Sequence, residues 1–389
     1  MQIKLIKSTF YNEDLTKGYL SDFIINSSKL SMGDQCQEFE KEFASYHNQK
    51  YACLVNSGSS ANLLLIQALM NLGKFKKGDN IGVSALTWST NTMPLFQLGL
   101  NPIPIDVEIE TLNVGLDSLI ETNKKYNLKG FFITNLLGFC SNLMDIKSYC
   151  ENNEILLLED NCESLGSIHK NKLLGTFGIG STSSFFVGHH LSTIEGGIVL
   201  TSNEHLYDSL ITSRAHGWSR NLNPKKKTKL RDKYGIDSFY NDYTFYELGY
   251  NFRATEVTGF LGKVQIKYLD EIVKIREKNF YLFYDQASKN NSIFDLKVDQ
   301  MKKISNFAYP LVFRDKSVYK MYREKFVKNE VEIRPIVSGN ISQQPFFKKH
   351  SDLRLNLKNA SYIHENGFYF PNNPELNEDE IEYILKLLK

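Results

Sequence analysis

Residues 181–202, STSSFFVGHHLSTIEGGIVLTS, place two adjacent histidines, His189 and His190, between two short runs of strand-forming residues. The first run, SSFF, leads into the histidines, and the second, IVLTS, follows an E-G-G turn. Ser184 precedes His189 by five positions, a separation short enough for both side chains to contact one bound group. A single histidine after a strand is more often structural than functional, but a pair in this setting is a candidate site.

An alternation of short apolar runs and longer amphipathic stretches extends over residues 50–200. Runs such as YACLVN, NIGVSAL, FFITNLL and ILLLED alternate with helix-like segments such as ANLLLIQALMNLG. Short β-rich runs separated by helices predict βαβ units on a mostly parallel sheet, and therefore an α/β fold. Ligands bind such sheets at the carboxyl ends of the strands, so polar residues that directly follow a run are the first candidates for a site.

Two polar clusters occupy such positions. In NSGSSANLL, Gly58 permits a tight turn and Ser59 offers a hydroxyl and an amide at a predicted helix N-terminus, where an anion is favoured. An ordinary serine N-cap explains this segment equally well. In ILLLEDNCESLGS, Asp160 ends a strand-like run and Glu163 follows three residues later. A carboxylate there suits a protonated ring nitrogen, although a strand-ending aspartate is commonly just a helix cap.

Composition excludes several classes of protein. The 389 residues are 42% hydrophobic and 23% charged, with 46 basic and 44 acidic side chains and a net charge of +2. This balance argues against nucleic acid as a partner. The chain shows no signal-peptide pattern and no run of about 20 apolar residues, so we expect a cytoplasmic protein without membrane contact. The five scattered cysteines include no C-x-x-C pair, which predicts reduced thiols and no metal or iron–sulfur site.

The length predicts one large core and a smaller second lobe. We assign residues 1–265 to a large α/β domain that includes the N-terminal segment and an insertion loop at 219–245, rich in lysine and aromatic residues. Such a loop is typical of a functional or subunit-contacting segment. Residues 254–287 repeat apolar positions at helical spacing and predict one long helix. This connecting helix and a small α+β domain form the second unit, residues 266–389.

The frame around His189 resembles the sugar aminotransferase (DegT/DnrJ/EryC1/StrS) family of fold-type I pyridoxal phosphate enzymes. In that family a strand reading S-F-x-x-x-K-x-L, followed by G-E-G-G, carries the lysine that binds the cofactor covalently. Here the stretch reads S-F-F-V-G-H-H-L and then I-E-G-G, so His189 stands in place of the lysine. The resemblance covers nearly the whole chain, through SGSSAN, ALTWSTN, EDNCESLG, RAHGW, GYNFRATEVTGFLG and RPIVSGNISQQPFF. It implies an aspartate aminotransferase-like fold with the cofactor in the large domain.

The resemblance also implies roles for individual residues. Gly58, Ser59 and Ser184 would bind the cofactor phosphate, and Asn251 would reach that phosphate from the neighbouring subunit of a homodimer. Trp88 would stack on the pyridine ring, Asp160 would pair with its nitrogen, and Glu163 would lie near its hydroxyl. Contacts with the substrate or the amino donor are assigned to His216, Arg220, Arg334 and Asn340, although Arg220 is equally compatible with a surface charge and the last two with a strand edge.

Replacement of the lysine by histidine resembles the branch of this family that acts as GDP-4-keto-6-deoxy-sugar 3-dehydratases, known from colitose biosynthesis. The implied reaction uses L-glutamate to convert pyridoxal phosphate to pyridoxamine phosphate, whose amine condenses with the 4-keto group of a nucleotide-linked sugar of the 6-deoxymannose or 6-deoxyheptose type. His189 then acts as the base, and the C3 hydroxyl leaves. A cousin branch carries an iron–sulfur cluster on cysteines that include a C-x-C pair, which this chain lacks.

Two other functions remain open. An ordinary nucleotide-sugar 4-aminotransferase would need its lysine elsewhere, for instance at Lys172 in the turn-like HKNKLLG. A non-catalytic nucleotide-sugar-binding protein on the same fold would have no use for the cofactor-type residues Trp88, Asp160 and Ser184. His190 and His216 are the next candidates for the base if His189 is not.

Overall fold

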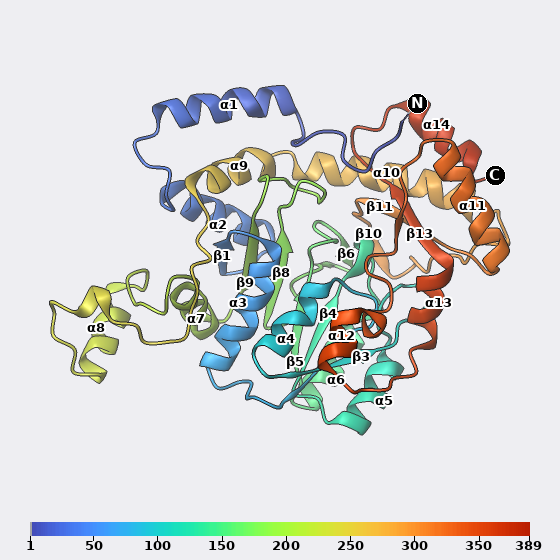
Figure 1. The fold of residues 1–389 in the computed structure, drawn as a ribbon. Helices are drawn as coiled ribbons and strands as arrows, with labels where there is room; N and C mark the ends of the chain where they lie inside the picture. Colours follow the sequence, from blue (N-terminus) through green and yellow to red (C-terminus); the bar gives the residue numbers. More distant parts are fainter. Residues whose placement is uncertain (1) are drawn as a thin grey trace.

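A seven-stranded sheet forms the centre of the computed structural model, which describes residues 2–389 (Figure 1). The strand order is β1-β9-β8-β5-β4-β2-β3, and β9 alone runs antiparallel to both of its neighbours. The predicted α/β fold with a mostly parallel sheet is therefore confirmed. The strands are β1 (Tyr51–Val55), β2 (Asn80–Ser84), β3 (Asn101–Ile105), β4 (Gly130–Thr134), β5 (Leu156–Asp160), β8 (Gly180–Ser184) and β9 (Gly197–Thr201).

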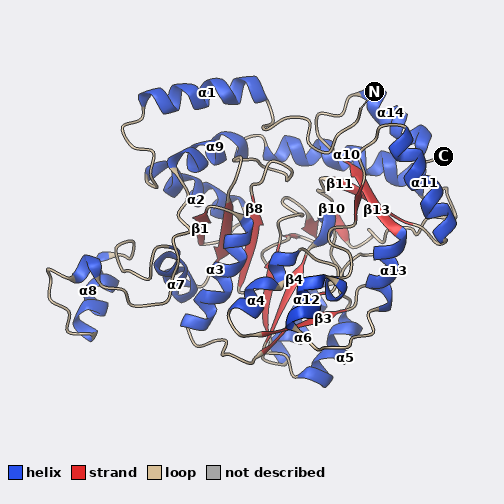
Figure 2. Cartoon of the chain, in the orientation of Figure 1, coloured by secondary structure: helices blue, strands red, loops and turns tan. Residues whose placement is uncertain are grey.

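Helices cover both faces of this sheet, so its strands are buried on both sides, as in other parallel sheets (Figure 2). In β1, Cys53 and Val55 pack with α3 and α7, while Ala52 and Leu54 pack with α2 on the opposite face. The helices of this part are α1 (Glu13–Asn26), α2 (Asp34–Tyr46), α3 (Gly58–Asn71), α4 (Met93–Gln97), α5 (Leu116–Tyr126), α6 (Leu143–Asn152), α7 (Glu204–Arg214), α8 (Pro224–Lys233) and α9 (Glu256–Ile266), with short 3-10 turns η1 (Ser89–Asn91), η2 (Leu136–Gly138) and η3 (Asn241–Tyr243).

The C-terminal part packs against one side of the large sheet (Figure 1). It begins with α10 (Leu269–Ala287) and contains an antiparallel sheet in the order β11-β13-β12. A third sheet, β10-β6-β7, joins this part to the turn that follows β5. The elements are β6 (Ile168–His169), β7 (Lys172–Leu173), β10 (Met301–Lys303), β11 (Ala308–Val312), α11 (Lys316–Lys328), β12 (Arg334–Pro335), η4 (Ile341–Gln343), α12 (Pro345–His350), α13 (Lys358–Asn366), β13 (Gly367–Pro371) and α14 (Glu378–Leu387).

The predicted division at residue 265 stays a prediction. One hydrophobic cluster contains both Phe139, from before the division, and Phe280, from after it, with ring centroids 5.7 Å apart. The N-terminal segment also pairs with the C-terminal part, because the Ile3 amide donates to the Glu330 carbonyl at 3.0 Å. The two predicted units therefore share a continuous apolar core.

Two local predictions were wrong. Residues 254–287 do not form one helix: α9 ends at Ile266, a turn follows at Lys267 and Tyr268, and α10 begins at Leu269. Apolar spacing does not reveal this break, because Ile266 before the turn and Leu269 after it pack in the same hydrophobic cluster. The segment 219–245 is not wholly a loop, since α8 begins at Pro224 under an Asn223 cap. All residues of α8 are at least partly exposed, and Figure 1 shows the helix projecting from the body of the molecule.

All five cysteines of the chain are free thiols. Cys36, Cys53, Cys140 and Cys150 are buried free thiols, and Cys162 is a partly exposed one. Across residues 2–389, no group of three or more His, Cys, Asp or Glu side chains is arranged to hold a metal ion. No helix in this described part of the chain is long and apolar enough to cross a membrane.

Candidate active site

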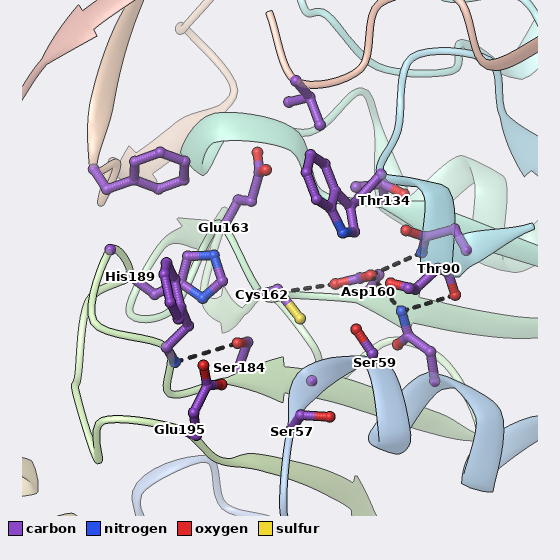
Figure 3. Close-up of a pocket in the computed structure, with 18 of the residues that line it drawn as sticks. Ser57, Ser59, Thr90, Thr134, Asp160, Cys162, Glu163, Ser184, His189 and Glu195 are labelled. Atoms are coloured by element: carbon purple, nitrogen blue, oxygen red, sulfur yellow. Dashed lines mark hydrogen bonds between the residues drawn. The ribbon is translucent and has the colours of Figure 1, made fainter. Parts of the chain in front are cut away.

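A cavity of about 330 Å³ opens at the carboxyl ends of β5 and β8 (Figure 3). Its walls come from the start of α3, the turn after β5, the turn after β8 and the C-terminal part of the chain. The predicted site residues that line it are Gly58, Ser59, Trp88, Asp160, Glu163, Ser184, His189 and Arg334. The fold thus brings together residues separated by as much as two thirds of the sequence.

The floor of the cavity is the N-terminus of α3. Ser57 caps this helix by accepting a hydrogen bond from the Ser60 amide at 3.1 Å. A Cβ atom on Gly58 would lie 2.6 Å from the Ser184 Cβ, so only glycine allows β8 to approach the helix this closely. Ser59 and Ser184 line the cavity at this end. Helix amides, a close approach and hydroxyl groups are the features that a bound phosphate requires, so the phosphate of the implied cofactor fits here.

Asp160 ends β5 and is held by three hydrogen bonds. Asn62 Nδ2 and Asn91 Nδ2 donate to Oδ2 at 3.0 and 2.8 Å, and the Cys162 amide donates to Oδ1 at 2.9 Å. Asn62 is fixed in turn because Thr182 Oγ1 donates to its Oδ1 at 2.6 Å. A carboxylate held rigidly at the strand end suits a protonated ring nitrogen of a cofactor.

The neighbouring Glu159 points to the other face of β5, as the two-residue period of a strand dictates. Its fully buried carboxylate accepts hydrogen bonds from the amides of Gly175, Phe177 and Gly178 at 2.6 to 2.8 Å. Glu159 therefore stabilises the turn that leads into β8. Of the two adjacent acidic residues, only Asp160 lines the cavity.

Glu163 faces the cavity from the turn after β5 (Figure 3). Its Oε2 accepts a hydrogen bond from the Leu137 amide at 3.1 Å. Burial and, to a lesser extent, the nearby charge of Asp160 raise the pKa of Glu163 to about 8. Its carboxyl group is therefore mostly protonated at neutral pH and can donate a hydrogen bond, for example to a ring hydroxyl oxygen of the cofactor.

His189 lies in the turn that follows β8, where its amide donates to the Phe186 carbonyl at 2.9 Å. Its ring lies among aromatic neighbours, with the ring centroids of Phe186 and Phe307 at 6.0 and 5.7 Å. Burial lowers the pKa of His189 to about 4, with a smaller lowering from Arg276 and an opposing influence from Asp160. The imidazole is thus neutral at physiological pH and able to accept a proton.

The adjacent His190 is directed away from the cavity. Its Nε2 lies 3.1 Å from the Ser305 carbonyl, and its side chain is buried. His190 is not among the residues that line the cavity. The pair predicted from sequence therefore divides into one histidine that faces the cavity and one that packs in the interior.

The opening of the cavity combines aromatic and charged groups. Trp88 is 55% exposed, and Phe307 and Tyr369 form the wall from the C-terminal part. Arg334 brings a positive charge, although its Nη2 also pairs with Glu332 at 2.7 Å. This end of the cavity has the composition expected for contacts with a nucleotide or a sugar.

Four predicted residues do not line the cavity of their own chain. Asn340 is buried, caps η4 and donates to Ser361 Oγ at 2.9 Å, a structural role. His216 packs on Trp218, and the Arg220 guanidinium stacks over the Trp218 and Tyr243 rings at 3.9 and 4.6 Å. Asn251 is exposed on the segment that pairs with Ala215.

Several polar residues of the cavity were not predicted from the sequence, among them Asn62, Asn91 and Glu195. Asn62 and Asn91 lie in the quoted motifs SGSSAN and ALTWSTN, so their membership of those motifs was the available signal. Glu195 is the acidic residue of the E-G-G turn before β9. Each was overlooked because asparagine and glutamate next to turns usually serve as caps or solvated groups.

The sheet order, the helix N-terminus beneath the cavity and the carboxylate at the end of β5 define an α/β protein with an aminotransferase-type site. The chain belongs to the DegT/DnrJ/EryC1/StrS aminotransferase family, whose model matches residues 18–389. The GDP-4-keto-6-deoxy-D-mannose 3-dehydratase of Escherichia coli O55:H7 is 37% identical over 372 residues, which are 94% of this chain and 95% of the relative.

Solved structures agree with this assignment. A crystal structure of a GDP-4-keto-6-deoxymannose-3-dehydratase variant, with a histidine replaced by asparagine and GDP-perosamine bound, matches with a TM-score of 0.91 at 35% identity. Another structure of a GDP-4-keto-6-deoxymannose-3-dehydratase, with a trapped PLP-glutamate geminal diamine, matches with a TM-score of 0.90 at 35% identity. Both comparisons cover all of this chain and all of the other.

Proposed function

We propose that this chain is a pyridoxal phosphate-dependent 3-dehydratase that removes the C3 hydroxyl from a GDP-linked 4-keto-6-deoxy sugar. The observation that carries the proposal is the position of His189. It lines the cavity beside Asp160, and among residues 2–389 no lysine lines that cavity. The site therefore offers a proton acceptor and lacks an amine that would bind the cofactor covalently.

The residues present fit the cofactor at both of its ends. The α3 N-terminus with Ser59 and Ser184 would hold the phosphate, Asp160 would pair with the ring nitrogen, and Trp88 would cover the ring. When bound in its pyridoxamine form, the cofactor supplies the amine that condenses with the sugar ketone and a ring that accepts electrons. The protein contributes orientation and the transfer of protons.

His189 is the residue that we assign to proton transfer. Its burial keeps the imidazole neutral, so it can accept the proton from the exocyclic carbon C4′. The resulting imidazolium can then donate that proton to the departing C3 hydroxyl, which leaves as water. Because the C3 hydroxyl leaves and C4 gains no proton, the released sugar would carry its nitrogen as an enamine, which water hydrolyses to ammonia and the 4-keto group.

Asn251 and the segment around it support a homodimer with shared sites. Asn251 is exposed and lies outside the cavity of its own chain. The excursion at 216–251, which contains the 219–245 insertion and Asn251, carries large exposed apolar side chains, with Phe239 at 80%, Tyr243 at 72% and Leu248 at 73% exposure. Apolar groups gathered at this density indicate a contact surface. A second copy of this chain covering that surface would bring Asn251 to the partner's phosphate end.

L-glutamate is the proposed amino donor, in line with the PLP–glutamate adduct named for one structural neighbour. GDP is proposed because the relatives at 35% to 37% identity are named for GDP-linked sugars. A 6-deoxymannose and a 6-deoxyheptose remain the candidate sugars, since small differences in a pocket change selectivity by only about 1–3 kcal/mol. We place the reaction in the cytoplasm, where the free thiols would stay reduced.

The test is a product analysis with the purified chain, pyridoxal phosphate, L-glutamate and a panel of GDP- and CDP-linked 4-keto-6-deoxy sugars. Mass spectrometry should show a sugar lighter than its substrate by one oxygen atom, with equal amounts of 2-oxoglutarate and ammonia. A 4-amino sugar without ammonia would identify an aminotransferase instead. Failure to form 2-oxoglutarate with any substrate would favour a non-catalytic binding protein.

The aminotransferase alternative loses its structural basis at Lys172. This residue lies on β7, and its Nζ stands 5.6 Å from the centre of the Phe177 ring. It does not line the cavity. Borohydride reduction of the loaded protein should therefore leave the cofactor removable, whereas a covalent cofactor would contradict the proposal.

A further inference from the structure

Arg276 is a buried cation on α10 with no acidic partner in direct contact. Its side chain is 4% exposed, and it forms no ion pair with any carboxylate of residues 2–389. Glu375 acts on its charge only from a longer distance, and burial lowers the pKa of Arg276 to about 9. Burying a guanidinium without a paired carboxylate is costly, so its hydrogen bonds must provide a compensating benefit.

Those hydrogen bonds go to three backbone carbonyls. Nη1 donates to the carbonyls of Asn306 and Asn372 at 3.2 and 2.7 Å, and Nη2 donates to the carbonyl of His189 at 3.3 Å. The same network is closed by Asn372 Nδ2, which donates to the Arg276 carbonyl at 2.9 Å and to Asn306 Oδ1 at 2.6 Å. A planar guanidinium with five donors is suited to holding several carbonyls in a fixed arrangement.

Each of the three segments carries a wall of the cavity. His189 is itself a lining residue, Asn306 precedes the lining residue Phe307, and Asn372 closely follows β13 with its lining residue Tyr369. The Phe307 ring also contacts the His189 ring at a centroid distance of 5.7 Å. One side chain on α10 thus connects the turn of the proposed base with the segment of Phe307, whose ring lies beside the imidazole, and with the segment of Tyr369, whose ring packs on Phe307.

We propose that Arg276 is a positioning residue, which acts through the carbonyl of His189 and holds the imidazole in the orientation that proton transfer requires. This proposal depends on the proposed function only because the proton transfer in question belongs to the proposed dehydration. Arg276 does not itself line the cavity, and its hydrogen bond to the lining residue His189 goes to the backbone carbonyl, so its positioning influence passes through the backbone. Misplacement of a reacting group by as little as 1 Å can reduce a rate by about 100-fold. Hydrogen bonds that fix the position of His189 can therefore outweigh the free-energy cost of burying the Arg276 charge.

The charge of Arg276 also acts on the imidazole. A nearby cation disfavours the protonated ring, and Arg276 contributes to the lowered pKa of both His189 and His190. It thereby helps to keep the base neutral before the reaction. The other titratable or charged side chains around this turn and the facing cavity include those of Asp160, Cys162, Glu163, Glu195, His190, Arg334 and Tyr369, and on the opposite side of the turn those of Tyr11 and Glu375.

Three variants separate geometry from charge. Arg276→Met removes both the donors and the charge, Arg276→Gln keeps a donor, and Arg276→Lys keeps the charge with fewer donors. Arg214→Lys is the matched control, because Arg214 is equally buried at 4% but pairs with Glu40 at 2.5 Å, away from the cavity. All four should lower the thermal stability, since each leaves buried carbonyls or a carboxylate with fewer partners.

In the reconstituted enzyme we expect Arg276→Met to lower kcat about 10- to 100-fold with little change in KM, and Arg276→Lys to recover part of that loss. The pKa of His189 can be measured in the cofactor-free protein by NMR of labelled histidine, with the His189 signal assigned by its loss in His189→Asn. This pKa should rise by up to about one unit in Arg276→Met and remain unchanged in Arg214→Lys. If Arg276→Met does not fold, Arg276→Gln serves for both measurements.

A kcat for folded Arg276→Met within about twofold of wild type would overturn the proposal. The proposal would also fail if the pKa of His189 were unchanged in Arg276→Met and kcat decreased only in proportion to the fraction of folded protein. Absence of dehydratase activity in the wild-type chain would instead refute the proposed function. In that case the NMR titration alone decides the role of Arg276, since it needs neither cofactor nor substrate.

Discussion

Predicted site residues lie in two regions of the molecule, the carboxyl ends of β5 and β8 and the excursion at 216–251. The two regions differ in burial and in the direction in which their side chains point. Asp160 and Ser184 are buried at strand ends, and three hydrogen bonds hold Asp160 in place. Asn251 is exposed, and the Arg220 side chain stacks within the excursion itself. The first region forms a site within one chain, whereas the second presents its residues outward.

This difference shows how the two regions can be tested. A strand-end residue acts on the site of its own chain, so its replacement should impair every site that the mutant chain forms. A residue of the excursion, in the proposed dimer, acts on the partner's site, so a wild-type partner should compensate for its loss. The four experiments below use this distinction, beginning with the largest expected effect.

His189→Asn should lower the dehydration rate about 100- to 10,000-fold, the usual contribution of a general base, while cofactor affinity stays close to wild type. The rate is measured by the release of 2-oxoglutarate and deoxy sugar, and the affinity by absorbance titration with pyridoxamine phosphate. His190→Asn is the control: because His190 points to Ser305, we expect reduced stability with a largely retained rate. A near-normal rate in His189→Asn would place the base elsewhere.

Asp160→Asn should weaken cofactor binding about 10- to 100-fold, because a hydrogen bond between charged groups is replaced by a neutral one. Glu159→Gln is the matched control on the same strand, since Glu159 bonds to the backbone of the following turn and lies outside the cavity. It should lower Tm and leave cofactor affinity unchanged. Equal loss of affinity in both variants would show a general distortion of β5 and remove the special role of Asp160.

Asn251→Ala should reduce cofactor affinity by about 10-fold, less than Asp160→Asn does, because it removes only the contact that one subunit makes with the cofactor of its partner. Co-expression of Asn251→Ala chains with His189→Asn chains should restore activity in about a quarter of the sites, because half of the sites in each mixed dimer are intact. Each variant alone provides the baseline. If mixing restores nothing, Asn251 does not act across a subunit interface and the shared-site proposal fails.

Glu163→Gln should change the pH dependence of stability rather than the fold. The pKa of Glu163 is raised from 4.5 to about 8 by folding, so its stabilising contribution is complete below about pH 4.5 and is lost as pH rises towards 8. Glutamine keeps a donor but does not titrate. Thermal unfolding of the cofactor-free protein at pH 5 and pH 8 should therefore show a smaller drop in Tm for the variant, whereas parallel profiles would contradict the raised pKa.

The polar residues at the strand ends of the cavity were predictable from the sequence because they end or directly follow strand-like runs. Asp160 and Ser184 end β5 and β8, and His189 lies in the next turn, so the ordering rule for parallel sheets places them together. Asn62 and Asn91 could not be selected in this way. Their function depends on both amides meeting one carboxylate oxygen, and each taken alone resembles an ordinary polar residue near a helix end.

The excursion and the connecting helix show the limits of local patterns. The lysine-rich sequence PKKKTKLRDK forms α8 under an asparagine cap, although its composition favours a solvated loop. The apolar period of residues 254–287 continues through the turn at Lys267 and Tyr268 and so conceals the end of α9. Neither segment contributes a residue to the lining of the cavity.

The sequence by itself determined the chemistry of the cavity: a histidine in the turn after a strand, a carboxylate at a strand end and a glycine beneath Ser184. Strand ends and tight turns are local features, and the sheet topology converts them directly into neighbours. Only the tertiary structure revealed Arg276, whose three carbonyl partners lie 87, 30 and 96 residues away along the chain. On a helix this arginine looks like any charged residue, and its role arises only where three distant backbone segments converge.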